Sequence, residues 1–332
     1  MKSDKLLCAI ATCRPFFQQG RPLAPDDPLL QRALLERGVL TEFIPWEDAD
    51  YDWSRADVVM IRSTWNYHLH PEAYLAWAER VASVSRLLNP LPVVRWNLDK
   101  AGYFSDLHEA GIPTIPTRRL LRGETVHLAG LLAETGWMKF VAKPCIGANS
   151  YATLVIDASS ASSLAQGQQH LDRYLPERDM LLQPYLARVE AEGEHSHVFI
   201  AGRWSHVFSR VPFCERHGEI AGEELLQPGP DEMALAQLTM KTAERLLAVA
   251  PLLFGRVDLI RDEEGQWRLM ELEVNEPALH LEATNALTGL ADAFMALCAG
   301  GGWQFSCEMG ATGQRIAGDT RAGRGMLATR RT

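Results

Sequence analysis

The stretch FGRVDLIRDEEGQWRLMELEVNEP, residues 254–277, carries the most informative pattern in the chain. Two apolar-rich runs, over 253–260 and 267–274, flank a polar turn at 262–265. This arrangement predicts a β-hairpin, and Pro277 ends its second strand. The hairpin is the element from which we work outward to the rest of the fold.

The charged residues of this hairpin fall on one face. Side chains alternate between the two faces of a strand, so Glu271, Glu273 and Asn275 lie together, away from the apolar face. Folding about the turn brings Asp258 close to Glu271, with Arg256 on the same side. Three carboxylates, one amide and one guanidinium therefore project together from a sheet that is apolar underneath.

Three carboxylates at close range need either raised pKa values or a cation between them. Because the ligand set contains oxygen donors only, with no Cys or His, it is typical of Mg²⁺ rather than of zinc. Mg²⁺ held in this way usually completes its shell with water and nucleotide phosphate. The alternative is an ordinary amphipathic hairpin whose polar face lies in water.

Two lysines are candidates for phosphate contacts. Lys143 ends a predicted strand directly before Pro144, and the small-residue loop 145–150 follows. A point charge beside loop amides can hold phosphate, although the P-loop pattern is absent and an ordinary hairpin turn also explains the loop. Lys100 lies in the first turn of a predicted helix, where its charge opposes the helix dipole. This position indicates either an external anion or a solvated side chain.

The first hundred residues alternate strand-like and helix-like segments, which predicts a small parallel sheet with helices on its faces. Residues 87–95, rich in proline and asparagine, are predicted to be a connector. The expected strands cover 6–12, 40–45 and 58–61, and the expected helices cover 26–38 and 71–83.

The remaining chain predicts a second, more mixed region. Proline interrupts a strand at 183–186, where a free backbone edge could pair with a purine or serve as a domain linker. Residues 301–332 are rich in Gly, Arg and Thr without a period, and we predict a disordered tail. Helices are expected over 98–110 (capped by Asn97), 127–135, 159–174, 231–248 and 282–299, and strands over 118–121, 138–144, 151–156, 180–185, 195–200 and 203–211.

Composition limits the function classes. The chain has 332 residues, 47% of them hydrophobic, which predicts two domains or three small ones. The formal charge of −9 argues against a nucleic-acid partner, because no basic excess is available to meet phosphates. Six cysteines without metal spacing predict reduced, mostly buried thiols. We expect no membrane span and no secretory signal, and hence a cytoplasmic protein.

Three weaker patterns leave alternatives open. His195, His197 and His206 fall on adjacent predicted strands, where a zinc site competes with a structural or solvated role. Arg62 follows a strand at the edge where α/β sheets bind ligands, so it either pairs a substrate carboxylate or supports a domain interface. A nicotinamide-dependent oxidoreductase is disfavoured because no G-x-G-x-x-G follows the first strand.

The order of these motifs resembles the ATP-grasp ligases, the superfamily of glutathione synthetase and D-alanine–D-alanine ligase. The resemblance covers about residues 97–295. Its N-terminal part is similar to a RimK-type subgroup akin to the O-ureido-serine cyclo-ligase of cycloserine biosynthesis. The superfamily resemblance rests on a lysine opening a helix, a K-P strand end, the small-residue loop, the Q-P-Y-L segment, and the R-V-D and E-L-E strands. The subgroup resemblance rests on Asp52-Trp53, Arg62–Tyr67, Asn89-Pro90 and Trp96–Lys100.

The resemblance implies an α/β (α+β) ATP-grasp fold behind an N-terminal Rossmann-like pre-ATP-grasp domain. The implied domains are a substrate domain over 1–96, an ATP-grasp lid domain over 97–184 and an ATP-grasp catalytic domain over 185–300. The disordered tail covers 301–332. The family pattern places Asn two residues after the metal glutamate, where this chain has Glu273, so the assignment between Glu273 and Asn275 stays open. Ser196 stands where many members carry an arginine, and Arg210 and Arg256 are the nearest replacements.

The resemblance also implies site residues and chemistry. We expect a Mg-ATP-dependent ligase that joins a small carboxylate to an amine, with two Mg²⁺ ions or Mn²⁺ in their place. The alternative is a kinase-like phosphotransferase on the same scaffold. A homodimer is left open. The implied ATP contacts are Lys100, Lys143, Gly147, Ser150, Gln183, Tyr185, Leu186, and Glu190 or Glu194 at the ribose; the metal ligands are Asp258, Glu271, Glu273 and Asn275; the catalytic residues are Arg210 and Arg256; and the substrate residues are Arg62, Ser63 and Asn66.

Overall fold

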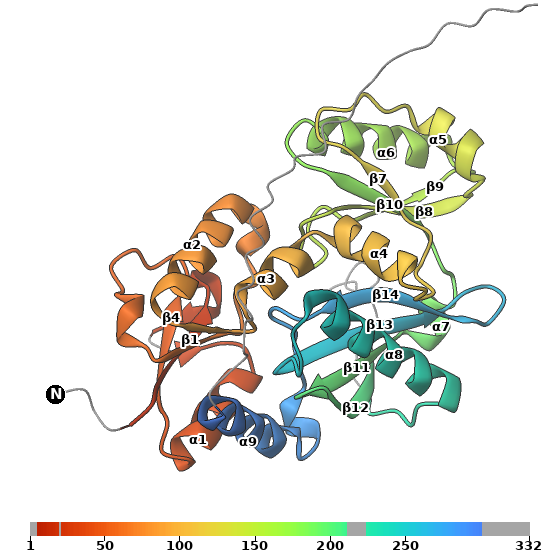
Figure 1. The fold of residues 1–332 in the computed structure, drawn as a ribbon. Helices are drawn as coiled ribbons and strands as arrows, with labels where there is room; N and C mark the ends of the chain where they lie inside the picture. Colours follow the sequence, from red (N-terminus) through yellow and green to blue (C-terminus); the bar gives the residue numbers. More distant parts are fainter. Residues whose placement is uncertain (1–4, 20, 211–223, 301–332) are drawn as a thin grey trace, which may run out of the picture. The chain divides into compact units, whose positions relative to one another are not determined.

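A computed structural model describes residues 5–19, 21–210 and 224–300, which contain three four-stranded sheets (Figure 1). Each sheet is built from a different part of the chain, and these parts follow one another in sequence. The mixture of one parallel and two antiparallel sheets agrees with the α/β (α+β) class expected from the sequence. The predicted tail, 301–332, lies outside the described residues.

The N-terminal sheet is parallel, with the strand order β4-β1-β5-β6. Its central strand is an uninterrupted apolar run, as expected for a strand covered on both faces. Helices alternate with the strands, as the sequence predicts. The elements are β1 (Leu7–Thr12), α1 (Asp26–Glu36), β4 (Leu40–Pro45), β5 (Val58–Ile61), α2 (Pro71–Val84) and β6 (Arg86–Leu88).

The predicted connector over 87–95 is wrong. Residues 87 and 88 belong to strand β6, and helix α3 (Leu91–Leu98) follows with Pro92 in its first turn. Proline is compatible with the first turn because the amide hydrogen it lacks would have no helical partner there. Asn97 is also not the cap of the next helix, α4 (Lys100–Glu109), because it belongs to the last turn of α3.

The central sheet is antiparallel, with the order β7-β10-β8-β9. In Figure 1 helices α5 and α6 lie along this sheet, and they bury a separate apolar cluster that includes Phe140, Leu171 and Leu182. Residues 183 and 184 still pair with β8, so the strand ends at the Q-P-Y-L segment rather than before it. The elements are β7 (Arg118–Leu120), α5 (Leu128–Thr135), β8 (Lys139–Pro144), β9 (Leu154–Asp157), α6 (Ala161–Tyr174) and β10 (Met180–Pro184).

The C-terminal sheet is antiparallel, with the order β12-β11-β13-β14, and it contains the predicted hairpin. Asp258 pairs directly with Glu271, and Arg256 with Glu273. Helix α8 packs against both hairpin strands. The elements are α7 (Val189–Glu192), β11 (Glu194–Ile200), β12 (Arg203–Arg210), α8 (Pro230–Leu247), β13 (Phe254–Arg261), β14 (Trp267–Glu273) and α9 (Ala286–Ala299).

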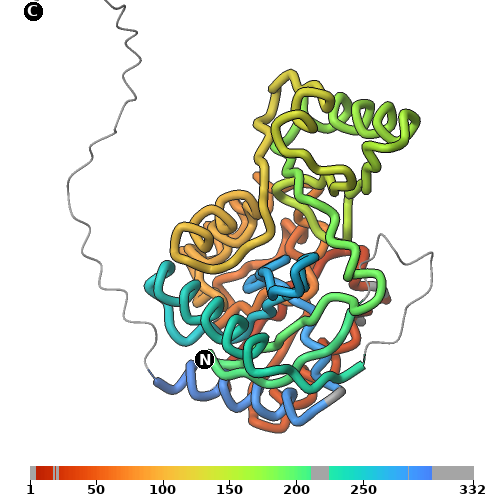
Figure 2. Tube along the Cα trace, turned by 90° about the vertical axis from the view of Figure 1, so that its right-hand side faces the viewer, coloured from red at the N-terminus to blue at the C-terminus, as the bar shows by residue number. Residues whose placement is uncertain are grey.

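The last helix returns to the N-terminal part of the chain. Both views show α9 beside α1, and the two helices are in contact (Figures 1 and 2). One apolar core joins Ile10 and Met60 of the N-terminal sheet, Phe254 of the C-terminal sheet, and Phe294 of α9. The described residues accordingly belong to one compact unit. Among the described residues, no helix combines the length and apolar character needed to cross a membrane.

Candidate active site

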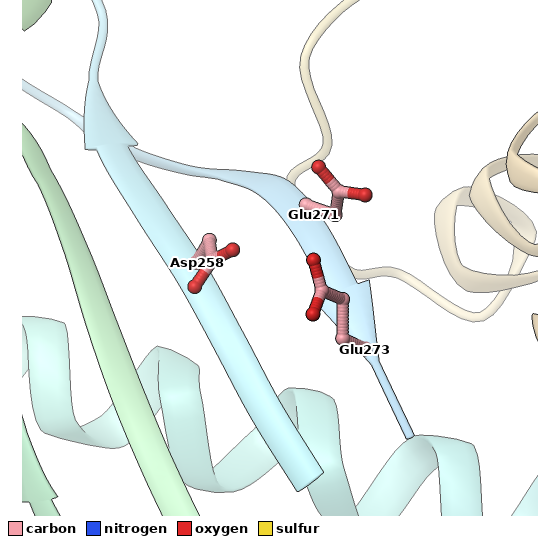
Figure 3. Close-up of side chains that lie close together, drawn as sticks. All are labelled: Asp258, Glu271 and Glu273. Atoms are coloured by element: carbon pink, nitrogen blue, oxygen red, sulfur yellow. The ribbon is translucent and has the colours of Figure 1, made fainter. Parts of the chain in front are cut away.

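Three carboxylates meet where β13 and β14 pair. Asp258 comes from β13, and Glu271 and Glu273 come from β14 (Figure 3). One ligand oxygen from each lies within 4.8 Å of the others. The alternation of side chains and the direct pairing of Asp258 with Glu271 produce this cluster.

Cations border the acidic cluster. Arg256 donates to both oxygens of Asp258 at 2.8 Å and to Glu273 at 2.7 Å. Lys100 Nζ lies 2.9 Å from Glu271 Oε1. Burial alone would raise the pKa of Glu271, but the Lys100 and Lys143 ammonium groups lower this pKa to about 2. Glu271 therefore stays ionised at neutral pH.

The pKa values of the other two carboxyl groups are shifted in opposite directions. Burial opposes ionisation of Asp258, but Arg256 and Arg210 lower its pKa below the ordinary value. Burial raises the pKa of Glu273, and the neighbouring carboxylates add to this effect. The three carboxyl groups supply oxygen donors only, which are the ligands that Mg²⁺ prefers. Asn275 also supplies a buried Oδ1 that has no hydrogen-bond partner among the described residues.

The two predicted phosphate lysines face the same cavity. This cavity has a volume of about 560 Å³, in the range of small-molecule sites. Lys100 opens α4, is buried, and donates from Nζ to the Gly147 carbonyl at 2.7 Å. Lys143, near the end of β8, lines the cavity together with Gly147 and Ser150 of the small-residue loop. The structure therefore brings this loop and both lysines to the acidic cluster.

The predicted adenine residues line the cavity, but Glu190, one of the two candidates for the ribose, does not. Gln183, Tyr185 and Leu186 are on its wall, and Gln183 Nε2 donates to Thr117 Oγ1 at 2.9 Å. Glu190 is not on the wall. Its carboxylate accepts from the Tyr185 hydroxyl at 2.8 Å and lies 3.3 Å from Lys139 Nζ.

Glu194 and Arg210 form a pair on the cavity wall. They are opposite residues of β11 and β12, and Arg210 donates to Glu194 Oε2 at 3.2 Å. Burial raises the pKa of Glu194 despite the nearby Arg210, and Asp258 adds to the rise. Because Arg210 also lies 3.8 Å from Asp258, the Glu194–Arg210 pair adjoins the acidic cluster.

The three predicted substrate residues lie behind the cavity wall. Arg62 is 2% exposed, faces Asp26 and Asp27, and donates to the Pro277 carbonyl at 3.2 Å. These contacts favour the second of its two predicted roles, support of a domain interface, because its charge is already paired. Ser63 donates to Asp27 at 2.6 Å. Asn66 donates to Glu47 and accepts from Trp46 Nε1.

Neighbours of these residues line the cavity instead. Phe16, Trp65 and Tyr67 are on the wall, and so is Glu276. The sequence argument did not identify Glu276, because it follows the end of β14 and strand alternation does not reach it. Burial raises the pKa of Glu276 to about 8, and Glu273 adds to the rise. The Glu276-Pro277 dipeptide, which follows the second hairpin strand, was the sequence signal that could have identified Glu276.

The three histidines do not converge. His195 and His197 both bond Glu232 of α8, at 2.7 and 2.9 Å, while His206 faces the Leu279 carbonyl at 3.0 Å. Among the described residues, Asp258, Glu271 and Glu273 form a group of potential metal ligands, and the three histidines do not. The zinc alternative is therefore unsupported, and the histidines hold α8 and the chain after β14 against the sheet.

Comparisons with known proteins agree with this geometry. Residues 8–89 match the model of the family described as "D-cycloserine synthetase DcsG, N-terminal domain". The cycloserine biosynthesis protein DcsG of Streptomyces lavendulae is 33% identical over 270 residues, which are 78% of this chain and 89% of that protein. The crystal structure of D-cycloserine synthetase DcsG covers 87% of this chain and 98% of its own, with a TM-score of 0.78 and 30% identity.

More distant structures share the fold. A RimK-domain ATP-grasp protein of Sphaerobacter thermophilus covers 86% of this chain and 98% of its own, with a TM-score of 0.63 at 15% identity. The D-alanine–D-alanine ligase of Bacillus anthracis covers 87% of this chain and 96% of its own, with a TM-score of 0.61 at 13% identity. The predicted ATP-grasp fold is thereby confirmed.

Proposed function

The chain belongs to the DcsG family of ATP-grasp ligases, which are ATP-dependent enzymes, and from this premise we propose that it joins a carboxylate to an amine through an acyl phosphate. The observation that carries the proposal is the cavity onto which Lys100, Lys143 and the acidic cluster of Asp258, Glu271 and Glu273 converge. Phosphate-binding cations on one side and metal-binding oxygens on the other match the needs of phosphoryl transfer.

The nucleotide would occupy the cavity from the end of β10 to the acidic cluster. Backbone groups and side chains of 183–186 would hold the adenine, and Lys100, Lys143 and the loop 146–150 would hold the phosphates. In the proposed domain division, 97–184 supplies the lid, 185–300 the catalytic sheet and 1–96 the substrate side. Closure of the lid over the phosphates would exclude water, which an acyl phosphate requires because it hydrolyses readily.

Asp258, Glu271 and Glu273 would hold Mg²⁺, and the unpartnered Oδ1 of Asn275 is a further candidate ligand. Bound there, Mg²⁺ would neutralise charge on the ATP phosphates. Glu271, whose pKa is about 2, is ionised and ready to ligate at neutral pH. Since Lys100 contacts Glu271 at 2.9 Å, the lysine would shift toward a phosphate when the metal takes its place.

The reaction would proceed in two displacements. A substrate carboxylate oxygen attacks the γ-phosphorus, the bond to the β–γ bridging oxygen breaks, and ADP leaves. An amine nitrogen then attacks the acyl carbon, the bond from this carbon to the phosphate oxygen breaks, and phosphate leaves with the amine losing a proton. Arg210, at the rim of the acidic cluster, would neutralise charge on the transferred group, while Arg256 holds Asp258 and Glu273 in place.

The substrate would be an amino-acid-like small molecule. The relative with 33% identity is named for cycloserine biosynthesis, and its structure is described as a D-cycloserine synthetase. An intramolecular ligation, in which acid and amine belong to one molecule, is therefore the first reaction to assay. O-ureido-serine is the first probe, followed by free amino acids with small amines.

Release of ADP and formation of the amide product test the proposal. Lys143→Ala and Glu271→Gln should each lower turnover at least a hundredfold while circular dichroism stays unchanged, since both side chains act on the phosphates or the metal. The matched controls are Lys241→Ala and Glu264→Gln, which alter exposed residues away from the cavity. Normal turnover in Lys143→Ala and Glu271→Gln would remove the assignment. ADP release that does not depend on an amine would favour a phosphotransferase.

A further inference from the structure

One part of the cavity wall borders the loop 145–150 from the N-terminal side, where the Tyr67 hydroxyl donates to the Gly147 carbonyl at 3.3 Å. It is formed by Glu276, which follows β14, and by three aromatic residues of the N-terminal region, Phe16, Trp65 and Tyr67. Phe16 and Trp65 contact each other edge to face, with ring centroids 4.8 Å apart. We call Glu276 and these three rings the aromatic acid subsite.

The carboxyl group of Glu276 is buried and incompletely bonded. Glu276 is 6% exposed, and its backbone carbonyl accepts from Trp65 Nε1 at 2.7 Å. The Tyr67 hydroxyl bonds to the side chain, but Oε2 has no hydrogen-bond partner among the described residues. Because a buried carboxylate oxygen without a partner is costly, the fold retains here an acceptor that a ligand can satisfy.

The nearest lysine does not fill this role. Lys100 affects Glu276 through space, but its ammonium group contacts Glu271 and the Gly147 carbonyl. Glu276 is also not a member of the cluster of potential metal ligands formed by Asp258, Glu271 and Glu273. The Oε2 atom of Glu276 is therefore available to a ligand other than Lys100 or the metal.

The rings beside Glu276 favour an organic cation. Aromatic faces attract ammonium groups, and this attraction grows where water is excluded. A carboxylate beside three aromatic rings is typical of a site that takes a primary ammonium group, whose hydrogen atoms can be shared between carboxylate and rings. A hydrated Mg²⁺ ion would instead need several further oxygen ligands.

We propose that the aromatic acid subsite binds the α-ammonium group of a free amino acid and so aims the neighbouring α-carboxylate at the phosphoryl group. This inference rests on the proposed function and names its substrate class. The electrostatic neighbours of Glu276 include Glu273 and Lys100, which belong to the metal and phosphate side of the cavity. In an α-amino acid one carbon atom separates ammonium from carboxylate, so a molecule anchored at Glu276 presents its carboxylate to that side.

The subsite predicts a chemical preference. Free α-amino acids should be accepted, whereas N-acetylated ones should be rejected, because acylation removes the positive charge and places a bulky group against the carboxylate. Carboxylates inside a peptide, which carry no adjacent ammonium, should be rejected for the same reason. The ammonium held at Glu276 is not the nucleophile, because a protonated amine has no free lone pair.

The experiment compares the unmodified enzyme with Glu276→Gln, which keeps the shape and removes the charge. Binding is measured by calorimetry with Mg²⁺ and a non-hydrolysable ATP analogue present, and the ligands are both enantiomers of O-ureido-serine, their N-acetyl derivatives and a panel of free amino acids. Glu282→Gln, an exposed change six residues along the chain, is the matched control. Circular dichroism and thermal unfolding report on the fold.

We expect Glu276→Gln to weaken binding of the accepted amino acid at least tenfold, with affinity for the nucleotide and the Mg²⁺ dependence unchanged within twofold. The variant should unfold at the same temperature or higher, because it replaces a buried, incompletely bonded carboxyl group with an amide of the same shape. Equal binding of N-acetylated and free amino acids, or an unchanged affinity in Glu276→Gln, would overturn the proposal. If the unmodified enzyme binds the nucleotide but no amino acid of the panel, the subsite fails while the ligase assignment stands; if it does not bind the nucleotide, the proposed function itself fails.

Discussion

Glu232 is a buried carboxylate outside the cavity, and its partners are two histidines. It lies in the first turn of α8 and accepts from His195 at 2.7 Å and His197 at 2.9 Å, while its second oxygen accepts from the Gly229 amide. Burial alone would raise the pKa of Glu232, but the hydrogen bonds from both histidines lower it from 4.5 to about 2. This single side chain therefore ties the start of α8 to strand β11.

A carboxyl group with a depressed pKa in the folded state stabilises the protein above its unfolded pKa and loses this contribution as the pH falls through the folded value. The contribution of Glu232, of the order of 3 kcal/mol for the shift from 4.5 to about 2, should therefore be complete at pH 6 and decline from about pH 5 toward pH 2. Urea unfolding of Glu232→Gln and the unmodified protein should show a difference in stability at pH 6 that narrows at pH 3.

Glu264→Gln, which changes an exposed acid in the β13–β14 turn, is the control and should show no such difference. A difference between Glu232→Gln and the unmodified protein that stays constant from pH 6 to pH 3 would contradict the assigned role.

At the scale of elements, the β13–β14 hairpin was predictable because its signal is local. A four-residue turn and a two-residue alternation determine which side chains share a face, and the observed pairing of Asp258 with Glu271 follows. Helix α3 was missed because its signal is ambiguous. The prolines at 90 and 92 are typical of a connector, yet they are equally suited to the start of a helix.

The junction of α7 and β11 depends on Gly193. This residue has φ +71° and ψ −175°, a conformation that is essentially restricted to glycine, and an added Cβ would lie 3.1 Å from the Arg210 carbonyl oxygen. Gly193→Ala should therefore lower the free energy of unfolding by about 1–3 kcal/mol. Urea unfolding measures this change.

Gly130→Ala is the matched control for this prediction. Gly130 lies inside α5 with open space around its Cα, so alanine there should be neutral or should stabilise the protein by up to about 1 kcal/mol. Equal effects of the two substitutions would show that the backbone conformation at 193 has no special cost.

At the scale of the whole molecule, two buried asparagines join the parallel N-terminal sheet and α3 to the β13–β14 hairpin. Asn89 donates to the Phe254 and Val274 carbonyls at 3.2 and 2.7 Å and accepts from the Leu253 amide at 2.9 Å. Asn97 donates to the Leu272 carbonyl and accepts from the Val274 amide. These amides connect backbone that is more than 160 residues away in the chain.

Asn89→Leu should destabilise the protein by about 3 kcal/mol or more, because three buried backbone groups lose their partner at once. The free energy of unfolding in urea measures the loss. Asn285→Ala is the control, since Asn285 is exposed and its side chain makes no capping hydrogen bond to α9. A cost below 1 kcal/mol for Asn89→Leu would show that water replaces the lost partners.

The sequence by itself determined the two strands of the hairpin and which of its side chains share a face. Strand alternation, turn residues and residue type act over a few positions, so they can be read locally. It placed Asp258, Glu271 and Glu273 on one face and indicated the importance of Lys100 and Lys143. Only the tertiary structure decided that Arg62 forms ion pairs with Asp26 and Asp27. It likewise decided that Asn89 and Asn97 hydrogen-bond to the hairpin and that Glu276 lines the cavity. Each of these contacts joins segments far apart in the chain, and no local pattern encodes which distant backbone or charge a side chain will meet.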